Sequence, residues 1–517
     1  MSGSKSEKGS QQKEPEKRRD RAAEVANTFE WLITAFILAF VFRAFVMEAF
    51  RIPTGSMADT LKGAHFRLRC RQCGYKYEYG FMPGSYGYVE DTIPPDSKEP
   101  PRTRCPSCGY IPVIRTPMPV ANGDRILVLK CIYQFVEPER WDVVVFRNPL
   151  KPRENYIKRL IGRPEEKLEI IDGDIYINGQ ISRKPPKVQD ELWMPVYDND
   201  YQPVNPGEPY FNNHIWQQPF RDANSKWEVD KVSPTLFRLN SPDERTSTLS
   251  YDPAVGNSFR ATYAYDGISE YESLPYCSDL MVRFFVDGLT SRGLIGIELS
   301  KYERRYKAWV DFRDQSEKMT MHIAMVTKDK EEEIVNKPVE TRLSVKRTVA
   351  VRFANVDHQL IFQFGNDRLI HDLGRGREDA GQITQRIGPQ VKIFGAGKLT
   401  LSHVAILRDV HYTDVDLRGG GPGWAMEGNP FTLAKDEFFV LGDNSPNSED
   451  GRRWNEPGKS NWGQSYRKGI VPRDYLVGKA LFVYWPSGFR PFAKARFAVI
   501  PNIGQLRFIY GGSNKEF

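Results

Sequence analysis

A single apolar run, WLITAFILAFVF at residues 31–42, constrains this chain more than any other feature, because no other stretch is long and apolar enough to cross a bilayer. Residues 29–47 would form about 28 Å of helix at about 1.5 Å per residue, with their charges near the ends. A buried helix and a cleavable signal peptide are alternative interpretations. We expect residues 29–49 to form a single transmembrane anchor.

The residues before this run set its orientation. Residues 1–28 mix charge with Gly, Ser and Gln and show no apolar period, so we expect a disordered tail. Four basic residues lie between Lys17 and Arg21, just before the apolar run. Because basic residues favour the cytoplasmic side, the sequence predicts a cytoplasmic N-terminus and an extracytoplasmic location, across a cell membrane, for the rest of the chain.

The overall charge argues against one class of partner. The 517 residues carry a net charge of +7, which over this length and without a long basic stripe does not indicate nucleic acid. The apolar run instead predicts membrane lipid as a partner. The length allows several domains, each with its own core.

Ser56, in the segment RIPTGSMADTL directly after the anchor, is a candidate nucleophile. A serine hydroxyl needs a base, and none of the seven histidines lies in a recognisable motif. His65 is close in sequence, but no Asp-His pattern or G-x-S-x-G elbow accompanies it. A Ser-His-Asp triad is therefore possible but unsupported.

Lys158 is the alternative base, because a buried lysine with a lowered pKa can take the serine proton. It lies in NYIKRLIG, a β-prone run. Alternation along this strand would put Tyr156, Lys158 and Leu160 on one face, and Ile157 and Arg159 on the other. Most lysines in strands point to water, so the spacing alone does not assign the role.

Two Cys-x-x-Cys pairs, each followed by Gly-Tyr, form a second motif. CRQCGY contains Cys70 and Cys73, and 31 residues later CPSCGY contains Cys105 and Cys108. Two such knuckles fit one tetrahedral zinc ion held by four thiolates. Disulfides within or between the pairs, or a redox pair, are the alternatives. We predict a zinc ribbon over residues 67–117, with structural zinc and no cofactor for catalysis.

Residues 185–427 contain short runs of alternating polarity separated by turn residues. Examples are TLFRL, LMVRFFVDGL, GLIGIEL, YKAWVDF, MTMHIAMVT and HQLIFQF. This pattern predicts an antiparallel β-sandwich. RFANVDHQLIFQFGNDRLIHD and KLTLSHVAILRDVHYT are similar to concanavalin-like jelly-roll domains. That likeness leaves open a carbohydrate- or protein-binding role, a spacer, or a wall that orients substrate.

Four short segments, in order, resemble the type I signal peptidases, which are membrane serine proteases with a Ser-Lys dyad. They are FRIPTGSMADTL, NGDRILVLK with WDVVVFRNP, YIKRLIG, and LGDNSPNSEDGRRW. The resemblance implies Ser56 as nucleophile, Lys158 as base and Thr54 as part of the oxyanion hole. It also implies that Ser448 steadies the lysine, and that Asp450 and Arg452 brace the site.

The resemblance also implies a substrate and a fold. Precursor proteins with Ala-x-Ala signal peptides would be cleaved next to the membrane, through small pockets for the residues at −1 and −3. Plain core packing is the alternative for the residues that match these pockets, namely Phe50, Ile52, Met57, Leu61, Tyr156 and Ile157. The expected fold is mainly β, with an antiparallel catalytic core at residues 50–66, 118–184 and 428–517, interrupted by the zinc ribbon and the β-sandwich.

Departures from the family pattern leave rival interpretations. Asp59 stands where the family usually has proline, Pro164-Glu165-Glu166 replaces a Pro-Gly-Asp turn, and Gly451 replaces a serine. A carboxylate at residue 59 close to Lys158 would weaken that base by raising its pKa. One rival is a catalytically silent, membrane-tethered binding protein that uses the β-sandwich. The other is a soluble, self-cleaving repressor with a Ser-Lys dyad, for which no DNA-binding helix pair is evident.

Overall fold

The computed structural model describes residues 21–82, 94, 96–97, 102–114, 117–207, 211, 215–222, 224–230, 232–241, 245–267, 273–289, 292–313, 319–328, 330–340, 348–415, 423–459, 465–488 and 500–512. The chain divides into two compact units, Met1–Glu48 and Ala49–Phe517. Each is described by itself below.

The first unit contains the apolar helix that the sequence predicts. Helix α1, Arg21–Val41, continues into a π-helical turn, η1, Phe42–Val46. Within it Glu24–Val46 is 23 residues long and includes an 18-residue window with a mean hydropathy of 1.9, sufficient by length and composition to cross a membrane.

The predicted boundaries of this helix are wrong by several residues. Residues 21–28, expected in a disordered tail, are helical, since RAAE favours helix and the Thr28 hydroxyl donates to the Glu24 carbonyl at 2.8 Å. Helical structure ends at Val46 rather than at residue 49, because strand β1 begins at Met47. Residues 1–20 of the expected tail lie outside the described residues.

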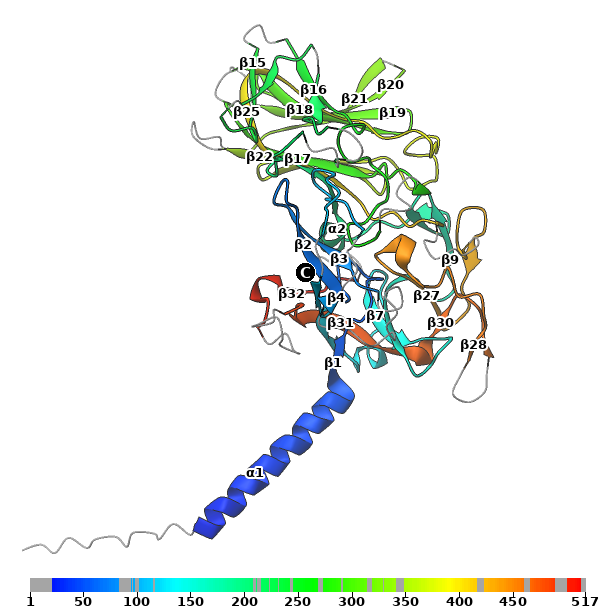
Figure 1. Cartoon of the computed structure of the whole chain (residues 1–517). Helices are drawn as coiled ribbons and strands as arrows, with labels where there is room; N and C mark the ends of the chain where they lie inside the picture. Colours follow the sequence, from blue (N-terminus) through cyan, green and yellow to red (C-terminus); the bar gives the residue numbers. More distant parts are fainter. Residues whose placement is uncertain are drawn as a thin grey trace, which may run out of the picture. The chain divides into compact units, whose positions relative to one another are not determined.

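The second unit is mainly β, as predicted (Figure 1). Its first sheet has eight strands in the order β1-β6-β31-β7-β8-β27-β30, and β32 pairs with β31. A second, four-stranded sheet has the order β11-β10-β9-β26. Their bounds are β1 Met47–Arg51, β6 Arg125–Leu129, β7 Val143–Arg147, β8 Asn155–Gly162, β9 Lys167–Ile171, β10 Asp174–Ile177, β11 Gln180–Ile181, β26 Phe431–Thr432, β27 Glu437–Leu441, β30 Val471–Pro472, β31 Leu476–Trp485 and β32 Arg507–Phe508.

The predicted strand NYIKRLIG is β8, and it occupies the interior of the first sheet between β7 and β27. An interior strand has neighbours on both edges, so its side chains can be held in place from two sides. The residues from Lys158 to the end of β8 are buried. The Lys158 ammonium lies 5.4 Å from the centre of the Tyr156 ring, which is consistent with the predicted shared face.

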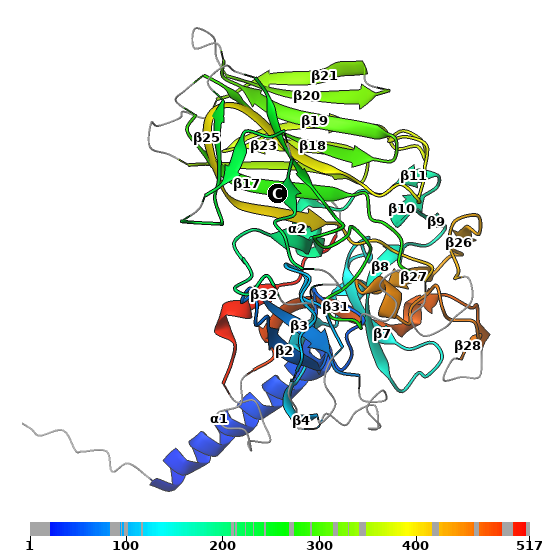
Figure 2. The ribbon, with the colours of Figure 1, turned by 45° about the horizontal axis from the view of Figure 1, so that its top comes forward.

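The largest sheet has fourteen strands, and its main path is β21-β20-β19-β18-β25-β17-β22-β23-β24. Figure 2 shows β18, β19, β20 and β21 side by side as one layer. All six predicted runs contain strands of this sheet, and these strands pair antiparallel as predicted. The bounds are β12 Met194–Asp198, β13 Phe220–Arg221, β14 Trp227–Val229, β15 Phe237–Ser241, β16 Ser247–Tyr251, β17 Leu280–Asp287, β18 Leu294–Lys301, β19 Arg304–Asp311, β20 Thr320–Thr327, β21 Lys330–Pro338, β22 Val349–Val356, β23 Gln359–Phe364, β24 Asp367–Asp372 and β25 Val391–Arg408.

Strand β25 joins two layers of this sheet. Its first part pairs with β18 and its last part pairs with β17, over a core that contains side chains from both layers. Between the two parts lies Gly397, whose φ of 95° suits glycine. A β-carbon there would lie 2.3 Å from the Arg292 carbonyl oxygen, so only glycine fits this bend.

The remaining short elements connect these sheets. They are a sheet of order β3-β2-β5-β4, the β28-β29 pair and helix α2. Their bounds are β2 His65–Arg69, β3 Lys76–Gly80, β4 Asp96–Ser97, β5 Met118–Ala121, α2 Pro186–Leu192, β28 Gly458–Lys459 and β29 Ser465–Tyr466, with single turns η3 Ile132–Gln134, η5 Ser445–Asn447, η6 Arg473–Tyr475 and η7 Ile503–Gln505.

A buried ionic cluster ties the sheet of β9 and β10 to the fourteen-stranded sheet. Lys184 lies 2.8 Å from Asp409 and also pairs with Asp357, while Lys301 pairs with Asp279 and lies 3.5 Å from Asp174. Although Asp174, Asp279 and Asp357 converge as metal ligands would, the two lysines already supply positive charge, so we assign no cation there.

Candidate active site

Ser56 and Lys158 meet although 102 residues separate them in the chain. Ser56 lies in the turn that follows β1, and Lys158 lies in β8. Lys158 Nζ is 2.6 Å from Ser56 Oγ, and the two residues are only 3% and 6% exposed. At this distance a neutral amine can take the hydroxyl proton, which is the step that makes serine nucleophilic.

The loop after β27 holds the backbone of Ser56 from the other side. The amide of Asn444 donates to the Ser56 carbonyl at 3.1 Å. The amide of Gly442 donates to Asp450 Oδ2 at 3.0 Å. The path of this loop therefore fixes where the main chain of Ser56 lies.

Asp450 and Arg452 stabilise this loop through a buried, bidentate ion pair. Arg452 donates from Nε to Asp450 Oδ1 at 2.9 Å and from Nη2 to Oδ2 at 2.8 Å, and neither side chain is exposed. Burial raises the pKa of Asp450, but Arg452 outweighs it and holds that pKa below its usual value. Arg452 Nη1 also donates to Ser445 Oγ at 2.7 Å, so the pair supports the turn η5.

A second buried pair, Arg159 with Asp443, was not predicted from the sequence. Arg159 donates from Nε and Nη2 to the two carboxylate oxygens of Asp443, each at 2.8 Å, and both side chains are fully buried. The signal that was available is the predicted alternation in β8, which turns Arg159 away from Lys158. Nothing in the sequence pattern identified its partner 284 residues later.

Other residues assigned by the family resemblance lie nearby. Ser448 is buried beside Asp450, and its hydroxyl helps to lower the pKa of that carboxyl. A β-carbon built on Gly442 would lie 2.2 Å from Ser448 Oγ and 2.4 Å from the Ser56 carbonyl oxygen, so Ser448 stands beside the nucleophile. Thr54, two residues before Ser56, belongs to the same loop.

Gly55 makes room for an aromatic ring from the β-sandwich. A β-carbon at this position would lie 2.1 Å from Cε1 of Tyr265. The Tyr265 hydroxyl donates to the Ala64 carbonyl at 2.8 Å, so the ring is fixed over the nucleophile loop. Nothing in the sequence pattern placed Tyr265 beside this loop.

His65 bonds elsewhere. Its Nδ1 lies 2.8 Å from the Gly63 carbonyl oxygen and its Nε2 lies 3.4 Å from Ser487 Oγ. Burial lowers the pKa of His65 to about 4. Its role is that of a neutral, buried histidine in the core.

The residues expected to line substrate pockets fall into two groups. Ile52, Met57 and Leu61 are at most 2% exposed and pack in one core cluster with strands β6, β7 and β31. Phe50 and Ile157 are partly buried at the edge of that cluster, and Tyr156 is partly buried beside a neighbouring one. Only the second group has surface that a substrate side chain could contact.

The departures from the family pattern have local partners. Burial raises the pKa of Asp59, and Lys62, Glu78 and Arg408 are the charges that act on it. Glu165 has a φ of 66°, in the left-handed region that favours the glycine of the family turn. Arg140 donates to both oxygens of Glu166, at 2.9 and 2.7 Å, so this glutamate closes the turn with an ion pair.

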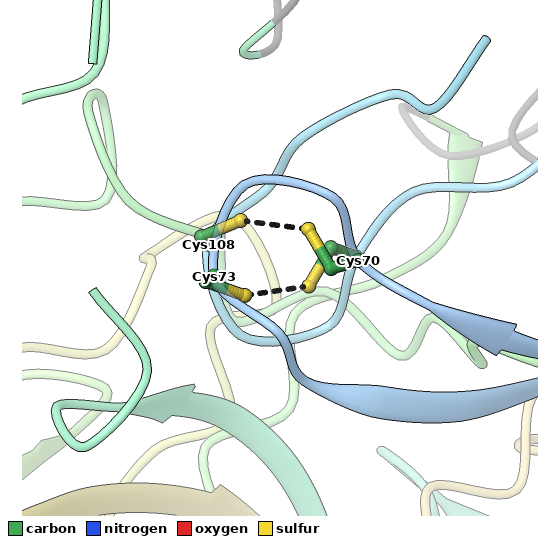
Figure 3. Close-up of side chains that lie close together, drawn as sticks. Cys70, Cys73 and Cys108 are labelled. Carbon is green, nitrogen blue, oxygen red and sulfur yellow. Dashed lines mark hydrogen bonds between the residues drawn. The ribbon is translucent and has the colours of Figure 1, made fainter. Parts of the chain in front are cut away.

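The four paired cysteines converge from two similar turns (Figure 3). Cys70 Sγ is 3.6 Å from Cys108 Sγ, and Cys73 Sγ is 3.6 Å from Cys105 Sγ. In each turn the glycine after the pair donates its amide to the first cysteine's carbonyl, Gly74 to Cys70 at 2.9 Å and Gly109 to Cys105 at 3.0 Å. The sulfur atoms of these pairs lie too far apart for a disulfide bond, which is about 2.05 Å long.

Comparison with protein families finds one family that matches two parts of this chain. The family model described as "Signal peptidase, peptidase S26" matches residues 111–215 and 417–485. Signal peptidase I of Rickettsia akari and that of Rickettsia canadensis are each 32% identical to this chain over 151 residues. The match covers 29% of this chain, and the chain spans 42% of the length of these relatives. The resemblance to type I signal peptidases is thereby confirmed.

Among solved structures, the chain is similar to a carbohydrate-binding module, CBM66, from Bacillus subtilis. The similarity has 10% sequence identity and a TM-score of 0.23, and it covers 37% of this chain and 95% of that one. Galectin LEC-6 of Caenorhabditis elegans gives 8% identity and a TM-score of 0.19, over 27% of this chain and 89% of that one. These scores are too low to establish a shared fold.

Proposed function

We propose that this chain is a membrane-anchored serine endopeptidase that removes signal peptides from secreted precursor proteins. The observation that carries the proposal is the 2.6 Å distance between Lys158 Nζ and Ser56 Oγ inside a buried site. The match to peptidase S26 supports the reaction class.

The proposed reaction has two stages. Neutral Lys158 takes the Ser56 proton while Oγ attacks the scissile carbonyl, and the resulting ammonium gives that proton to the departing amine. An ester to Ser56 remains. Lys158 then takes a proton from water, the hydroxide attacks the ester, and the proton returns to Ser56 as the signal peptide leaves, the mature protein being the amine released in the first stage. The amide of Ser56 and the hydroxyl of Thr54 are the proposed donors to the oxyanion.

Substrate recognition would use the part of the site that remains accessible. Phe50, Tyr156 and Ile157 are partly exposed and would contact the residues at −1 and −3, where Ala-x-Ala fits. The apolar helix would anchor the chain in a cell membrane, with its N-terminus in the cytoplasm and the catalytic sheet on the extracytoplasmic side. Ser448 would steady Lys158 once substrate closes the site.

Structural zinc is the cofactor we propose for residues 67–117. Four thiolates around zinc at about 2.3 Å stand about 3.8 Å from one another, close to the sulfur spacing of 3.6 Å in the two cysteine turns. The ion would hold the two turns together and would supply no step of the peptidase reaction. The ribbon and the sandwich are proposed as insertions in the catalytic core.

The test is cleavage of a synthetic precursor with an Ala-x-Ala site, in detergent, at several pH values. Ser56→Ala and Lys158→Met should both abolish cleavage after the second alanine, while Lys307→Met, a lysine of the sandwich, should retain it. Activity should increase toward alkaline pH, since the base must be neutral, and serine reagents designed for Ser-His triads should act poorly. No cleavage by the folded wild type would reject the proposal.

A binding function of the sandwich is the second candidate, and one surface favours it. Across β16, β25, β18, β19 and β20 the register aligns Thr248, Phe394, Gly296, Trp309 and His322, and the Trp309 and His322 rings stack at 4.9 Å. The next row aligns Ser250, Lys392, Glu298 and Lys307. The hollow over these rows measures about 510 Å³.

Aromatic rings beside hydroxyl and balanced charged groups suit an oligosaccharide, whose C–H faces pack on rings and whose hydroxyls need hydrogen-bond partners. Calorimetric titration with cellohexaose and chitohexaose tests this function. Binding that Trp309→Ala abolishes would support it, and binding unaffected by that change would exclude this surface. If the sandwich binds and the folded wild type does not cleave the precursor, the silent binding protein becomes the better interpretation.

A further inference from the structure

One segment of the β-sandwich, residues 257–267, leaves the fourteen-stranded sheet between β16 and β17 and reaches the candidate active site. Its base is fixed in the sandwich, since Phe259 packs in the core and its carbonyl accepts from the Cys277 amide at 2.8 Å. Ala261 donates to the Pro275 carbonyl at 2.9 Å. The tip, residues 263–266, is therefore presented to the catalytic sheet by a rigid support.

Asp266 connects this tip to the nucleophile through one intermediate residue. Its Oδ1 accepts from Asn444 Nδ2 at 2.9 Å and from Asn447 Nδ2 at 3.1 Å. Asn444 in turn donates its backbone amide to the Ser56 carbonyl at 3.1 Å. Asp266 is 7% exposed and Asn444 is fully buried, so water does not compete strongly for these bonds.

Two tyrosines of this tip contact the two loops that surround Ser56, namely the loop after β27 and the loop that contains Gly55. The Tyr263 hydroxyl donates to the Asp443 carbonyl at 2.8 Å and accepts from the Ser445 amide at 3.4 Å. Tyr265 covers Gly55, and its carbonyl accepts from the Gly80 amide at 2.8 Å. The loop on each side of Ser56 is thus held by a side chain of the sandwich.

We propose that Asp266 is a positioning residue for the Ser56–Lys158 pair, and that the sandwich is in this way part of the catalytic site. The inference rests on the proposed peptidase function. The carbonyl of Ser56 is fixed by Asn444, and the orientation of residue 56 sets where its amide points. That amide is the proposed donor to the oxyanion, so a small rotation weakens binding of the transition state more than binding of the substrate.

The effect is expected in kcat rather than in KM. Asp266→Ala removes a charged acceptor from Asn444, and kcat should fall about 10- to 100-fold with KM within about twofold of the wild type. Asp266→Asn keeps an oxygen acceptor at the same place and should restore kcat to within about threefold. The pH at half-maximal rate should not move in either variant, because the base remains Lys158.

The experiment measures kcat, KM and melting temperature for the full chain with the synthetic precursor. Asp190→Ala is the matched control, since this aspartate of α2 is 62% exposed and pairs with Arg352 of β22 rather than with the loops around Ser56. If Asp266→Ala fails to fold, Tyr263→Phe serves instead, because it keeps the ring and removes only the hydroxyl. Its kcat should fall about 3- to 10-fold.

The outcomes separate the two proposals. Inactive, folded wild type rejects the peptidase function, and the positioning role with it. Active wild type with an equally active Asp266→Ala variant overturns only the positioning role. The role is also overturned if KM rises as much as kcat falls, or if Asp266→Asn loses as much as Asp266→Ala, since both results indicate a general structural defect.

Discussion

Asp443→Asn tests the buried pair that lies behind the site. The substitution leaves the Arg159 guanidinium in place and replaces one of its two carboxylate contacts by an amide NH₂ group. Both side chains are fully buried, so the remaining charge cannot be hydrated. Removing one partner of a buried ion pair costs about 3–5 kcal/mol of unfolding free energy.

The structure places the expected value at the lower end of that range. Arg159 retains bonds to the carbonyls of Trp141 at 3.0 Å and Tyr510 at 3.3 Å, and Glu191 lies 4.0 Å away. We therefore expect a loss of about 3 kcal/mol, measured by urea unfolding of the detergent-solubilised chain. The substitution must lower the unfolding free energy rather than raise it, because water hydrates Arg159 in the unfolded state of both the variant and the wild type.

A surface pair provides the control. Arg473 is 34% exposed and contacts Glu137 at 2.8 Å, whose side chain is 76% exposed. Arg473→Gln should therefore cost less than about 1 kcal/mol. If Asp443→Asn costs no more than this control, the reasoning from burial is refuted.

Three further predictions concern pH, metal and Asp59. Because the pKa of buried His65 lies at about 4 instead of 6.5, the unfolded state binds more protons between these values, and the fold loses roughly 3 kcal/mol as pH falls through this window. His65→Asn should remove that part of the acid destabilisation from thermal melts; an unchanged slope would contradict it. Chelation should remove one zinc ion per chain, by elemental analysis, and lower the melting temperature, whereas a Cys108→Ser preparation that still holds a full equivalent would speak against the site. Asp59→Asn should leave the pH profile of cleavage in place, since burial, Lys62, Glu78 and Arg408 dominate the pKa of Asp59; a shift of that profile would restore the family-based concern.

Local sequence patterns predicted the strands correctly where apolar and polar residues alternate with a period of two. NYIKRLIG is β8, and the six alternating runs lie in strands of the large sheet, because period two survives when one face packs against a core. The helix start was missed for a related reason. RAAE is polar enough to look disordered, yet it extends a helix that the apolar residues after it already nucleate.

Long-range partners were not predictable from pattern. Arg159 and Asp443 are 284 residues apart, and no spacing rule connects them. A second limit concerns apolar residues close to Ser56 in sequence, because such a residue has the same sequence pattern in a substrate pocket and in a core. The core residues Ile52, Met57 and Leu61 are examples. Tyr265 and Asp266 belong to a region whose sequence indicated only a sandwich, so nothing placed them near Ser56.

The position of Tyr265 has a consequence for how the sandwich relates to catalysis. Its ring fills the space over Gly55 and Gly80, where β-carbons would lie 2.1 and 2.3 Å from Cε1. Two glycines and one ring fit together only if the sandwich is docked, because without the ring both glycines would border an empty, hydrated gap. Under the proposed mechanism, water in that gap would stabilise the ammonium form of Lys158, which must be neutral to act as the base. In the proposed peptidase, the sandwich would therefore belong to the catalytic unit by the same criterion as Ser448 or Arg452, namely that it shapes the surroundings of Ser56 and Lys158.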